Sequence, residues 1–197
     1  MRHLALFLIT LLSFITPAMA GSATALFAGG CFWCMESAYE EQEGVTGVVS
    51  GFTGGTLKKP TYSGNHAGHF EAVEVTYDPT VVNYQELLDL FWRNIDPLDD
   101  TGQFCDKGSS YRSAIFPATA AEREMAQQSR AAVAARFGGQ EVYTEVLDAG
   151  AFWPVEDHHQ DYYLKNPVRY KYYRWNCGRD QRLQQLWGNE AAIHSEN

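Results

Sequence analysis

Two cysteines three positions apart, Cys31 and Cys34, are the residues whose type and spacing most directly suggest chemistry in this chain of 197 residues. The short apolar run at 25–28 before them is typical of a buried strand, and two glycines then permit a sharp turn into a helix predicted from Phe32. Cys31 therefore stands at a helix N-terminus, where free amide donors and the helix dipole favour an anion. We expect its thiol to have a lowered pKa and to act as a nucleophile.

Other interpretations of the Cys31-x-x-Cys34 spacing are a structural disulfide and half of a zinc site. Cys34 lies at i+3 on the same helix face, which is close enough to pair with Cys31. The four cysteines lack the second closely spaced pair that a structural zinc site needs, so we predict no metal. The glycine turn, the helix start and the flanking aromatic residues together favour a reactive thiol.

The N-terminal residues 1–20 are typical of a signal peptide. Arg2 precedes an apolar stretch at 4–15, and the small residues before Gly21 suit cleavage after Ala20. The apolar stretch is short for a membrane-spanning helix, although an uncleaved anchor is the alternative. We therefore predict a periplasmic or secreted protein that has no membrane attachment after cleavage.

The mature chain, 21–197, has the length of a single domain. The whole sequence has a formal net charge of −9, which argues against nucleic acid and anionic membrane surfaces as partners. Hydrophobic periodicity and turn residues predict strands and helices in the order βαββαβ, followed by further elements. The predicted strands are 24–28, 45–53, 71–77, 111–116 and 141–147. The first predicted helix is 32–42, and the second follows the capping-box pair Asn83 and Glu86. A third helix is predicted between Thr119 and Gly138, and a short fourth one after Gly178. This order predicts an α+β fold, a two-layer sandwich with a ferredoxin-like βαββαβ core plus C-terminal extensions.

Several motifs in this order resemble the A type of peptide methionine sulfoxide reductase, and the match covers nearly all of the mature chain. The motifs are Gly30-Cys31-Phe32-Trp33, Pro60-Thr61-Tyr62, Gly68-His69-Phe70-Glu71, Tyr77-Asp78-Pro79, Tyr111-Arg112-Ser113-Ala114-Ile115 and Glu156-Asp157-His158-His159-Gln160.

The resemblance implies reduction of the S epimer of methionine sulfoxide, free or in a peptide, to methionine. It makes Cys31 the nucleophile that attacks the sulfoxide sulfur and is left as a sulfenic acid. Phe32 and Trp33 match the apolar pocket for the substrate's methyl group. No bound cofactor is implied, and the electrons come from an external thiol reductant, a thioredoxin-like partner.

Four polar residues complete the site that the resemblance implies. Glu71 matches the proton donor, which is needed because a sulfoxide oxygen leaves poorly until it is protonated. Tyr62 and Tyr111 match the tyrosines that hold the sulfoxide oxygen, and Asp106 matches the acidic residue beside them.

The sulfenic acid on Cys31 needs a second, resolving cysteine. Cys177 is favoured because it lies in a C-terminal segment next to a glycine, where the family often places this residue. Cys34 is the alternative because it lies one helical turn away, although a helical cysteine must distort that turn to reach disulfide geometry. Cys105, which precedes Asp106, ranks last.

Three competing functions are weighed against the reductase. A thioredoxin-like thiol–disulfide oxidoreductase using Cys31-x-x-Cys34 is the first, but such a protein does not need the constellation of two tyrosines and a glutamate. A disulfide-stabilised binding module is the second, and thiol titration distinguishes it. The third is a Cys–His hydrolase using His158 or His159, but we expect one histidine to pack and the other to be solvated.

Overall fold

The computed structural model describes residues 21–192 of the chain. The predicted signal peptide, 1–20, lies outside the described residues. Within 21–192, none of the helices has the length and apolar character needed to cross a membrane.

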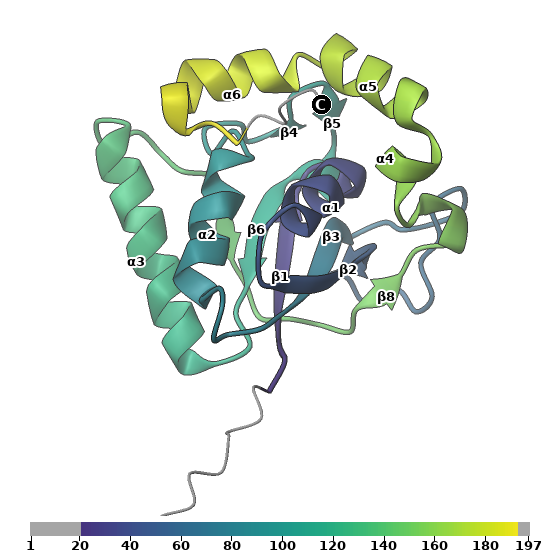
Figure 1. Cartoon of the computed structure of the whole chain (residues 1–197), viewed down its shortest axis with the longest axis horizontal. Helices are drawn as coiled ribbons and strands as arrows, with labels where there is room; N and C mark the ends of the chain where they lie inside the picture. Colours follow the sequence, from purple (N-terminus) through teal and green to yellow (C-terminus); the bar gives the residue numbers. More distant parts are fainter. Residues whose placement is uncertain (1–20, 193–197) are drawn as a thin grey trace, which may run out of the picture.

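A six-stranded sheet with the order β7-β6-β1-β3-β2-β8 forms the centre of the molecule (Figure 1). The four central strands, β6-β1-β3-β2, pair antiparallel and are connected as βαββαβ, which confirms the predicted ferredoxin-like core. Their bounds are β1 (Ala23–Gly29), β2 (Val45–Thr53), β3 (Phe70–Tyr77) and β6 (Ser113–Phe116), and the outer strands are β7 (Glu145–Val146) and β8 (Trp153–Pro154).

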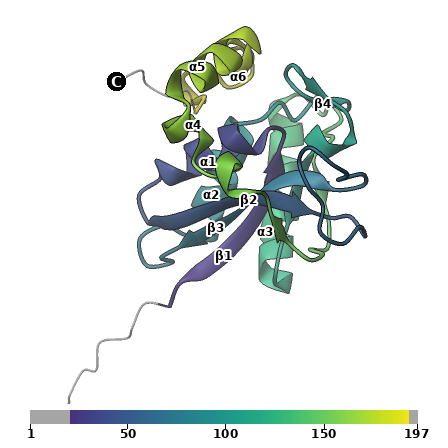
Figure 2. The ribbon, with the colours of Figure 1, turned by 90° about the vertical axis from the view of Figure 1, so that its right-hand side faces the viewer.

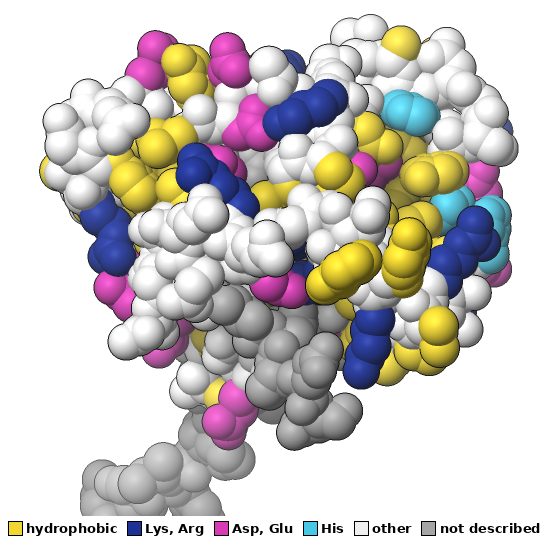
Figure 3. Space-filling model, turned by 90° about the horizontal axis from the view of Figure 1, so that it is seen from above, with side chains coloured by type: hydrophobic (Ala, Val, Ile, Leu, Met, Phe, Trp, Pro, Cys, Tyr) yellow, Lys and Arg dark blue, Asp and Glu magenta, His cyan; other side chains and the backbone are white. Residues whose placement is uncertain are grey.

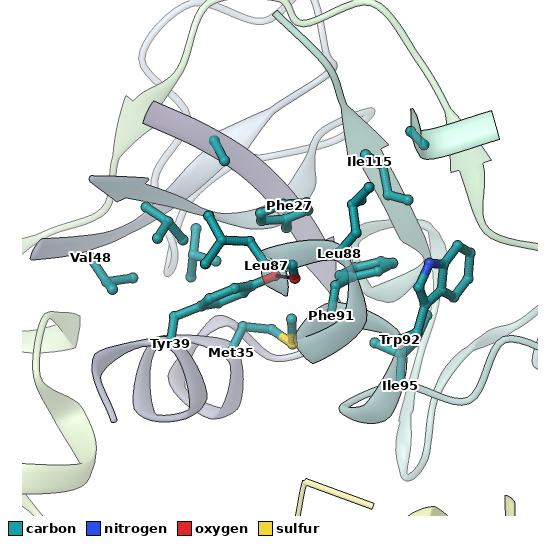
Figure 4. Packing of buried hydrophobic residues seen from close by; sticks show 14 of the residues in the cluster. Phe27, Met35, Tyr39, Val48, Leu87, Leu88, Phe91, Trp92, Ile95 and Ile115 are labelled. Atoms are coloured by element: carbon teal, nitrogen blue, oxygen red, sulfur yellow. Dashed lines mark hydrogen bonds between the residues drawn. The ribbon is translucent and has the colours of Figure 1, made fainter. Parts of the chain in front are cut away.

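The main hydrophobic core lies between one face of this sheet and two helices, α1 (Phe32–Glu40) and α2 (Tyr84–Arg93) (Figure 4). Phe27 of β1 stacks against Tyr39 of α1 and Phe91 of α2, with ring centroids 5.3 and 5.4 Å apart. Side chains alternate between the two faces of a strand, so the odd-numbered residues of β3 face these helices. Glu71 is one of them, and the core face therefore directs it towards the start of α1.

The predicted helix starts at Asn83 and Thr119 are confirmed. Both residues form capping boxes, with Glu86 and Glu122 respectively, at the N-termini of α2 and α3 (Ala120–Arg136). The reciprocal bonds satisfy amide groups that the first turn leaves without partners, which explains why both boundaries could be placed from the sequence.

The predicted fifth strand, 141–147, is too long, because only Glu145–Val146 pairs with β6. Arg130 of α3 donates hydrogen bonds to the carbonyls of Val142 and Thr144, at 2.6 and 2.9 Å. The Tyr143 amide donates to the Pro97 carbonyl at 2.9 Å. The backbone groups of this segment are thus bonded to a helix side chain and a loop instead of a strand.

The predicted strand 111–116 starts too early, since Tyr111 belongs to a short helix, η1 (Ser109–Tyr111). The segment 97–110, which leads into η1 and β6, contains a small hairpin of β4 (Gly102–Gln103) and β5 (Asp106–Lys107). This hairpin and η1 place the residues that follow Pro97 at the end of the sheet where α1 begins.

The C-terminal segment is helical and lies over the α1 end of the core (Figures 1 and 2). It consists of η2 (Asp157–His159), α4 (Tyr162–Lys165), α5 (Pro167–Asn176), α6 (Arg179–Trp187) and η3 (Gly188–Glu190). The terminal helix α6 was predicted, whereas the aromatic and basic stretch that forms α5 was not. Arg179 and Trp187 of α6 donate to the carbonyls of Asn94 and Ile95, at 2.6 and 3.1 Å, and so bind this segment to the core.

Candidate active site

The glycine turn after β1 places Cys31 at the start of α1. Gly30 has a φ of +82°, and a Cβ there would lie 2.5 Å from the Gln103 Cβ, so only glycine fits. Cys31 is the N-cap residue of α1, and its carbonyl accepts from the amide of Cys34 at 3.1 Å. The expected position of this cysteine at a helix N-terminus is confirmed.

Glu71 lies directly beside the nucleophile candidate. Its Oε2 accepts a hydrogen bond from the Phe32 amide, the first amide of α1, at 3.1 Å. Its other carboxyl oxygen, Oε1, has no hydrogen-bond partner among residues 21–192. Burial raises the pKa of Glu71 to about 8, although the Phe32 hydrogen bond lowers it. The carboxyl group is therefore protonated near neutral pH and able to donate that proton.

The two thiols of Cys31 and Cys34 are both free and buried, with exposed fractions of 5% and 1%. Burial, a hydrogen bond with Cys34 and the nearby Glu71 raise the pKa of the Cys31 thiol. The expectation of a lowered Cys31 pKa is therefore wrong, because burial and the neighbouring acids outweigh the helix N-terminus. The same hydrogen bond, together with the charges of Arg179 and Arg174, lowers the pKa of Cys34. The shared hydrogen bond therefore shifts the pKa values of the two thiols in opposite directions.

The two tyrosines predicted from the sequence lie close to Glu71. Burial, followed by the charges of Glu71 and Cys31, raises the pKa of Tyr62 to about 12. Burial and Glu71 also raise the pKa of Tyr111. Both hydroxyl groups are consequently protonated over the physiological pH range and serve as hydrogen-bond donors.

Asp106 is linked to this group by Tyr173, which sequence reasoning missed. The Tyr173 hydroxyl donates a hydrogen bond to Asp106 Oδ2, and the Tyr173 ring packs against the cluster that contains Cys31 and Cys34. Burial raises the pKa of Asp106, and the Tyr173 bond lowers it. The signal for Tyr173 was the unassigned aromatic run at 170–175, because a helix there presents Tyr170 and Tyr173 on the face that packs against the cysteines.

Aromatic rings form one wall of the site around Trp33. Its ring stacks on Tyr162 at a centroid distance of 3.8 Å, on His159 at 5.6 Å and on Tyr62 at 6.1 Å. His159 is buried and His158 is exposed, so one histidine packs and the other is solvated, as predicted. Glu156 helps to hold the wall, since its Oε2 accepts from the Tyr62 amide at 3.4 Å.

A disulfide joins Cys105, just before β5, to Cys177, the C-cap residue of α5. Cys105, which the sequence ranked last, is thus the cysteine that the structure pairs with Cys177. The Sγ of Cys177 lies 4.0 Å from Asp106 Oδ2, and Asp106 in turn bonds Tyr173. Tyr173 and Asp106 therefore connect the buried thiol pair to the disulfide.

Two clusters of potential metal ligands occur among residues 21–192. One consists of Cys105, Asp106 and Cys177, whose sulfur atoms are joined in the disulfide and so are not thiolate ligands. The other consists of three acidic residues, Glu36, Glu40 and Asp161. Tyr163 donates to Glu40 at 2.6 Å and Lys165 forms an ion pair with Asp161 at 3.2 Å, so the protein itself supplies partners for this charge.

A buried thiol beside a protonated carboxylic acid, with a disulfide two side chains away, defines a thiol-dependent oxidoreductase. Residues 23–191 match the family model described as peptide methionine sulfoxide reductase. Peptide methionine sulfoxide reductase MsrA 2 of Caulobacter vibrioides is 49% identical over 177 residues, which cover 87% of this chain and 90% of the relative.

Two solved structures have the same fold. Methionine sulfoxide reductase A of Corynebacterium diphtheriae gives a TM-score of 0.67 at 34% identity and covers 78% of each chain. Reduced Mxr1 of Saccharomyces cerevisiae gives a TM-score of 0.70 at 27% identity and covers 78% of this chain and 91% of that one. The chain belongs to the peptide methionine sulfoxide reductase family, in its A type.

The activity is the thiol-dependent reduction of methionine sulfoxide, with a resolving disulfide. The alternative of a thioredoxin-like oxidoreductase is not favoured, since the family match extends over the whole described fold. The resemblance inferred from the sequence motifs is confirmed, as is the α+β fold class.

Proposed function

We propose that Cys31 is the nucleophile and Glu71 the general acid of this reductase. The observation that carries the proposal is the buried Glu71 carboxyl group, bonded to the first amide of the helix that Cys31 begins. Cys34 takes up the Cys31 proton through the hydrogen bond between the two thiols, which moves the negative charge to Cys31. The Cys31 thiolate then attacks the sulfoxide sulfur.

Glu71 transfers its proton to the sulfoxide oxygen as that oxygen develops charge. Tyr62 and Tyr111 donate hydrogen bonds to the same oxygen, because their raised pKa values keep the hydroxyl groups protonated. The products are methionine and a sulfenic acid on Cys31, so the sulfoxide is reduced and the thiol oxidised by two electrons. Asp106 positions Tyr173 beside Cys31.

The apolar rings of Phe32 and Trp33 receive the substrate's methyl group in this proposal. Phe32 contacts Phe52 and Tyr62 at centroid distances of 5.8 and 5.9 Å, so its ring is held in a fixed orientation. A rigid methyl pocket on one side and the oxygen-binding tyrosines on the other distinguish the S epimer from the R epimer.

Cys177 is the proposed resolving cysteine. Its thiol condenses with the Cys31 sulfenic acid, releasing water and forming a Cys31–Cys177 disulfide. Cys105 then exchanges with it, which gives the Cys105–Cys177 disulfide of the structure and returns Cys31 to the thiol. Cys34 is the alternative resolver.

A thioredoxin-like protein is the proposed electron donor. The yeast relative Mxr1 has been solved in complex with Trx2, with a TM-score of 0.52 and 20% identity to this chain. Oxidised methionine, free or in proteins, is the substrate, and neither nucleic acid nor membrane is a partner.

Residues 1–20 are proposed to direct export to the periplasm or the medium, with cleavage after Ala20 and a single reductase domain in 21–197. N-terminal sequencing of the exported protein tests this directly. A mature chain that begins at Gly21 is expected, and an intact N-terminus in a membrane fraction contradicts it.

Turnover of the S and R epimers of methionine sulfoxide with dithiothreitol tests the activity and its stereochemistry. We expect reduction of the S epimer alone. Equal rates on the two epimers contradict the proposed geometry, as does activity that survives in a Cys31→Ser variant.

A further inference from the structure

Arg179, the first residue of α6, is a buried arginine without a carboxylate partner. It is only 1% exposed, yet it forms no ion pair with any residue of the described part of the chain, 21–192. Its Nη2 donates to the backbone carbonyls of Asn94 and Gly29, at 2.6 and 3.4 Å, and its Nε has no hydrogen-bond partner within the same range. A buried cation is costly unless an anion compensates it, so we expect an anion close to Arg179.

Neighbouring arginines do have acidic partners. Arg174 of α5 donates from Nη2 and Nε to the two carboxylate oxygens of Asp180, at 2.6 and 3.1 Å. Arg182, three residues after Arg179 on α6, donates from Nε to Asp96 Oδ2 at 2.6 Å. On the face that α4, α5 and α6 form, Lys and Arg side chains are likewise spread among Asp and Glu side chains (Figure 3). Arg179 differs from these arginines because no carboxylate of residues 21–192 is paired with its charge.

The Arg179 guanidinium lies beside the segment that carries both buried thiols. Gly29, whose carbonyl it bonds, lies two residues before Cys31. Met35, whose Sδ is 3.4 Å from the Arg179 Nη2, directly follows Cys34. The hydrogen bond with Cys31, followed by the charge of Arg179, lowers the pKa of Cys34 against the effect of burial. The unpaired cation and the two thiols therefore interact.

We propose that Arg179 is a positioning residue of the reductase, whose buried positive charge stabilises the thiolate that forms when the Cys31–Cys34 pair loses a proton. The inference rests on the proposed function, in which this pair supplies the attacking thiolate, and it adds the counter-charge of that anion. Arg179 acts on the thiols and not on the substrate.

The thiol pair needs such a charge because the helix N-terminus is not sufficient. Cys31 has a raised pKa although it is the N-cap residue of α1, since burial, the Cys34 hydrogen bond and the nearby Glu71 oppose its ionisation. Phe104 holds the Arg179 guanidinium in place, with 4.5 Å between Cζ and the centroid of the ring. A fixed charge in a site that excludes water interacts more strongly with an anion than a charge at the surface does.

The other titratable or charged groups that face the thiols do not provide this charge. Glu71 of β3 faces them with a carboxyl group that burial keeps protonated near neutral pH. Arg174 of α5 also faces Cys34, but Asp180 neutralises it. The tyrosines are neutral because burial raises their pKa values, and they are Tyr62, Tyr111, Tyr170 and Tyr173.

Asp106 is a second anion near Arg179. Burial raises the pKa of Asp106, whereas the Tyr173 hydrogen bond and then the charges of Arg179 and Lys107 lower it. The Asp106 carboxylate thus has Tyr173 as a donor and Lys107 as a neighbouring cation. Compensation of Asp106 alone is the alternative, and in that case the loss of Arg179 leaves the titration of the two thiols unchanged.

The test measures the titration of the two thiols by the ultraviolet absorbance of the thiolate, in enzyme whose Cys105–Cys177 disulfide is intact. Cys31 and Cys34 are then the free thiols, so the midpoint of the titration belongs to this pair. The test variant is Arg179→Gln, which removes the charge but keeps a side-chain donor. Arg179→Lys keeps the charge.

Arg182→Gln is the matched control. It removes the same charge from the same helix, and Arg182 also binds α6 to the segment that follows α2, through Asp96. Loosening of α6 is therefore common to both glutamine variants, whereas the contacts beside the thiols are those of Arg179. Arg179→Met, which keeps an unbranched apolar stem against Phe104, replaces Arg179→Gln if that variant does not fold.

Arg179→Gln is expected to raise the midpoint by about one pH unit, which leaves about tenfold less thiolate at a pH below it. Release of methionine in the first turnover near neutral pH should fall by a similar factor, because the thiolate is the attacking species. The midpoint of Arg179→Lys should stay close to the parent value, and that of Arg182→Gln should not change.

An unchanged midpoint in Arg179→Gln overturns the inference. An equal rise in Arg179→Gln and in either Arg179→Lys or Arg182→Gln also overturns it, since the charge of Arg179 is then not the cause. The titration needs no turnover, so it is independent of the proposed function. Absence of methionine release from the parent enzyme with dithiothreitol overturns the proposed function instead.

Discussion

The two cysteine pairs of this protein differ in almost every physical respect. Cys31 and Cys34 are three residues apart, buried and reduced, whereas Cys105 and Cys177 are 72 residues apart, near the surface and joined. Burial around Cys31 keeps Glu71 protonated, which the reduction of a sulfoxide requires. A protein reductant, by contrast, reaches only an exposed disulfide. Reduction of a sulfoxide and reaction with a protein reductant need opposite environments, and the two cysteine pairs provide them.

Their attachment to the fold differs in the same way. Cys31 is the N-cap residue of α1 and Cys34 lies in its first turn. Met35 and Tyr39 of the same helix are fully buried in the main core. The second pair joins a small hairpin to the end of α5, outside that core. Rigid attachment to the core suits a site that orients the substrate, whereas a peripheral position suits sulfur atoms that change partners during the catalytic cycle.

Replacing Cys31 is expected to have the largest effect, because it removes the sulfur atom that we propose attacks the substrate. Cys31→Ser should release no methionine in a single turnover with any reductant. Cys34→Ser, the matched variant on the same helix, should still release methionine, at a rate lowered by loss of its proton-accepting thiolate. Single-turnover release measured by chromatography checks both, and full activity of Cys31→Ser contradicts the assignment.

Glu71→Gln should slow the chemical step roughly 10²-fold or more, the scale of losing a general acid, with little change in KM. The acid must carry its proton, so the parent's rate should fall as pH rises through about 8, the pKa to which burial raises Glu71. The variant should lack this decline. Glu74→Gln, on the same strand, is the control, and an identical pH profile in Glu71→Gln would place the proton elsewhere.

Cys177→Ser and Cys105→Ser sharpen the comparison between the pairs. Both variants should release one equivalent of methionine at the parent's rate, since the buried pair is intact. Continued turnover with thioredoxin should nearly cease, because the exposed disulfide no longer forms. Sustained thioredoxin-driven turnover in Cys177→Ser would show that Cys34 resolves the sulfenic acid.

Glu36→Gln should have the smallest effect, on stability. Burial raises the pKa of Glu36 to about 7 from an ordinary value of 4.5, so the folded protein binds the proton more tightly than the unfolded chain. The resulting stabilisation is fully present below about pH 4.5 and is lost as pH rises through 7.

The variant should therefore gain stability relative to the parent at pH 8, by on the order of 2 kcal/mol, and gain little at pH 4. Urea unfolding at the two pH values measures the difference. Glu43→Gln, at an exposed position shortly after α1, is the control. An equal effect of Glu36→Gln at both values would show that packing, not ionisation, is responsible.

Elements with strong local signals could be predicted from the sequence. Capping boxes form at Asn83 and Thr119, and polar and apolar residues alternate along β3. Both signals depend on residues that are close in the sequence, so the boundaries of these helices and of this strand follow from short-range chemistry. The strand predicted at 141–147 does not form over its full length, because Arg130 of α3 donates hydrogen bonds to two carbonyl groups of this segment. The helix α5 was missed because its aromatic residues pack against distant partners, among them the cysteines on α1.

The sequence by itself determined the family, the order βαββαβ and the position of Cys31 at a helix start, because local motifs specify them. Only the tertiary structure decided that Cys31 has a raised pKa, that Tyr173 joins Cys31 to Asp106, and that Cys177 pairs with Cys105. A pKa depends on burial and on charges brought from other elements, and a disulfide depends on the distance between two sulfur atoms. Both are set by packing between residues far apart in the chain.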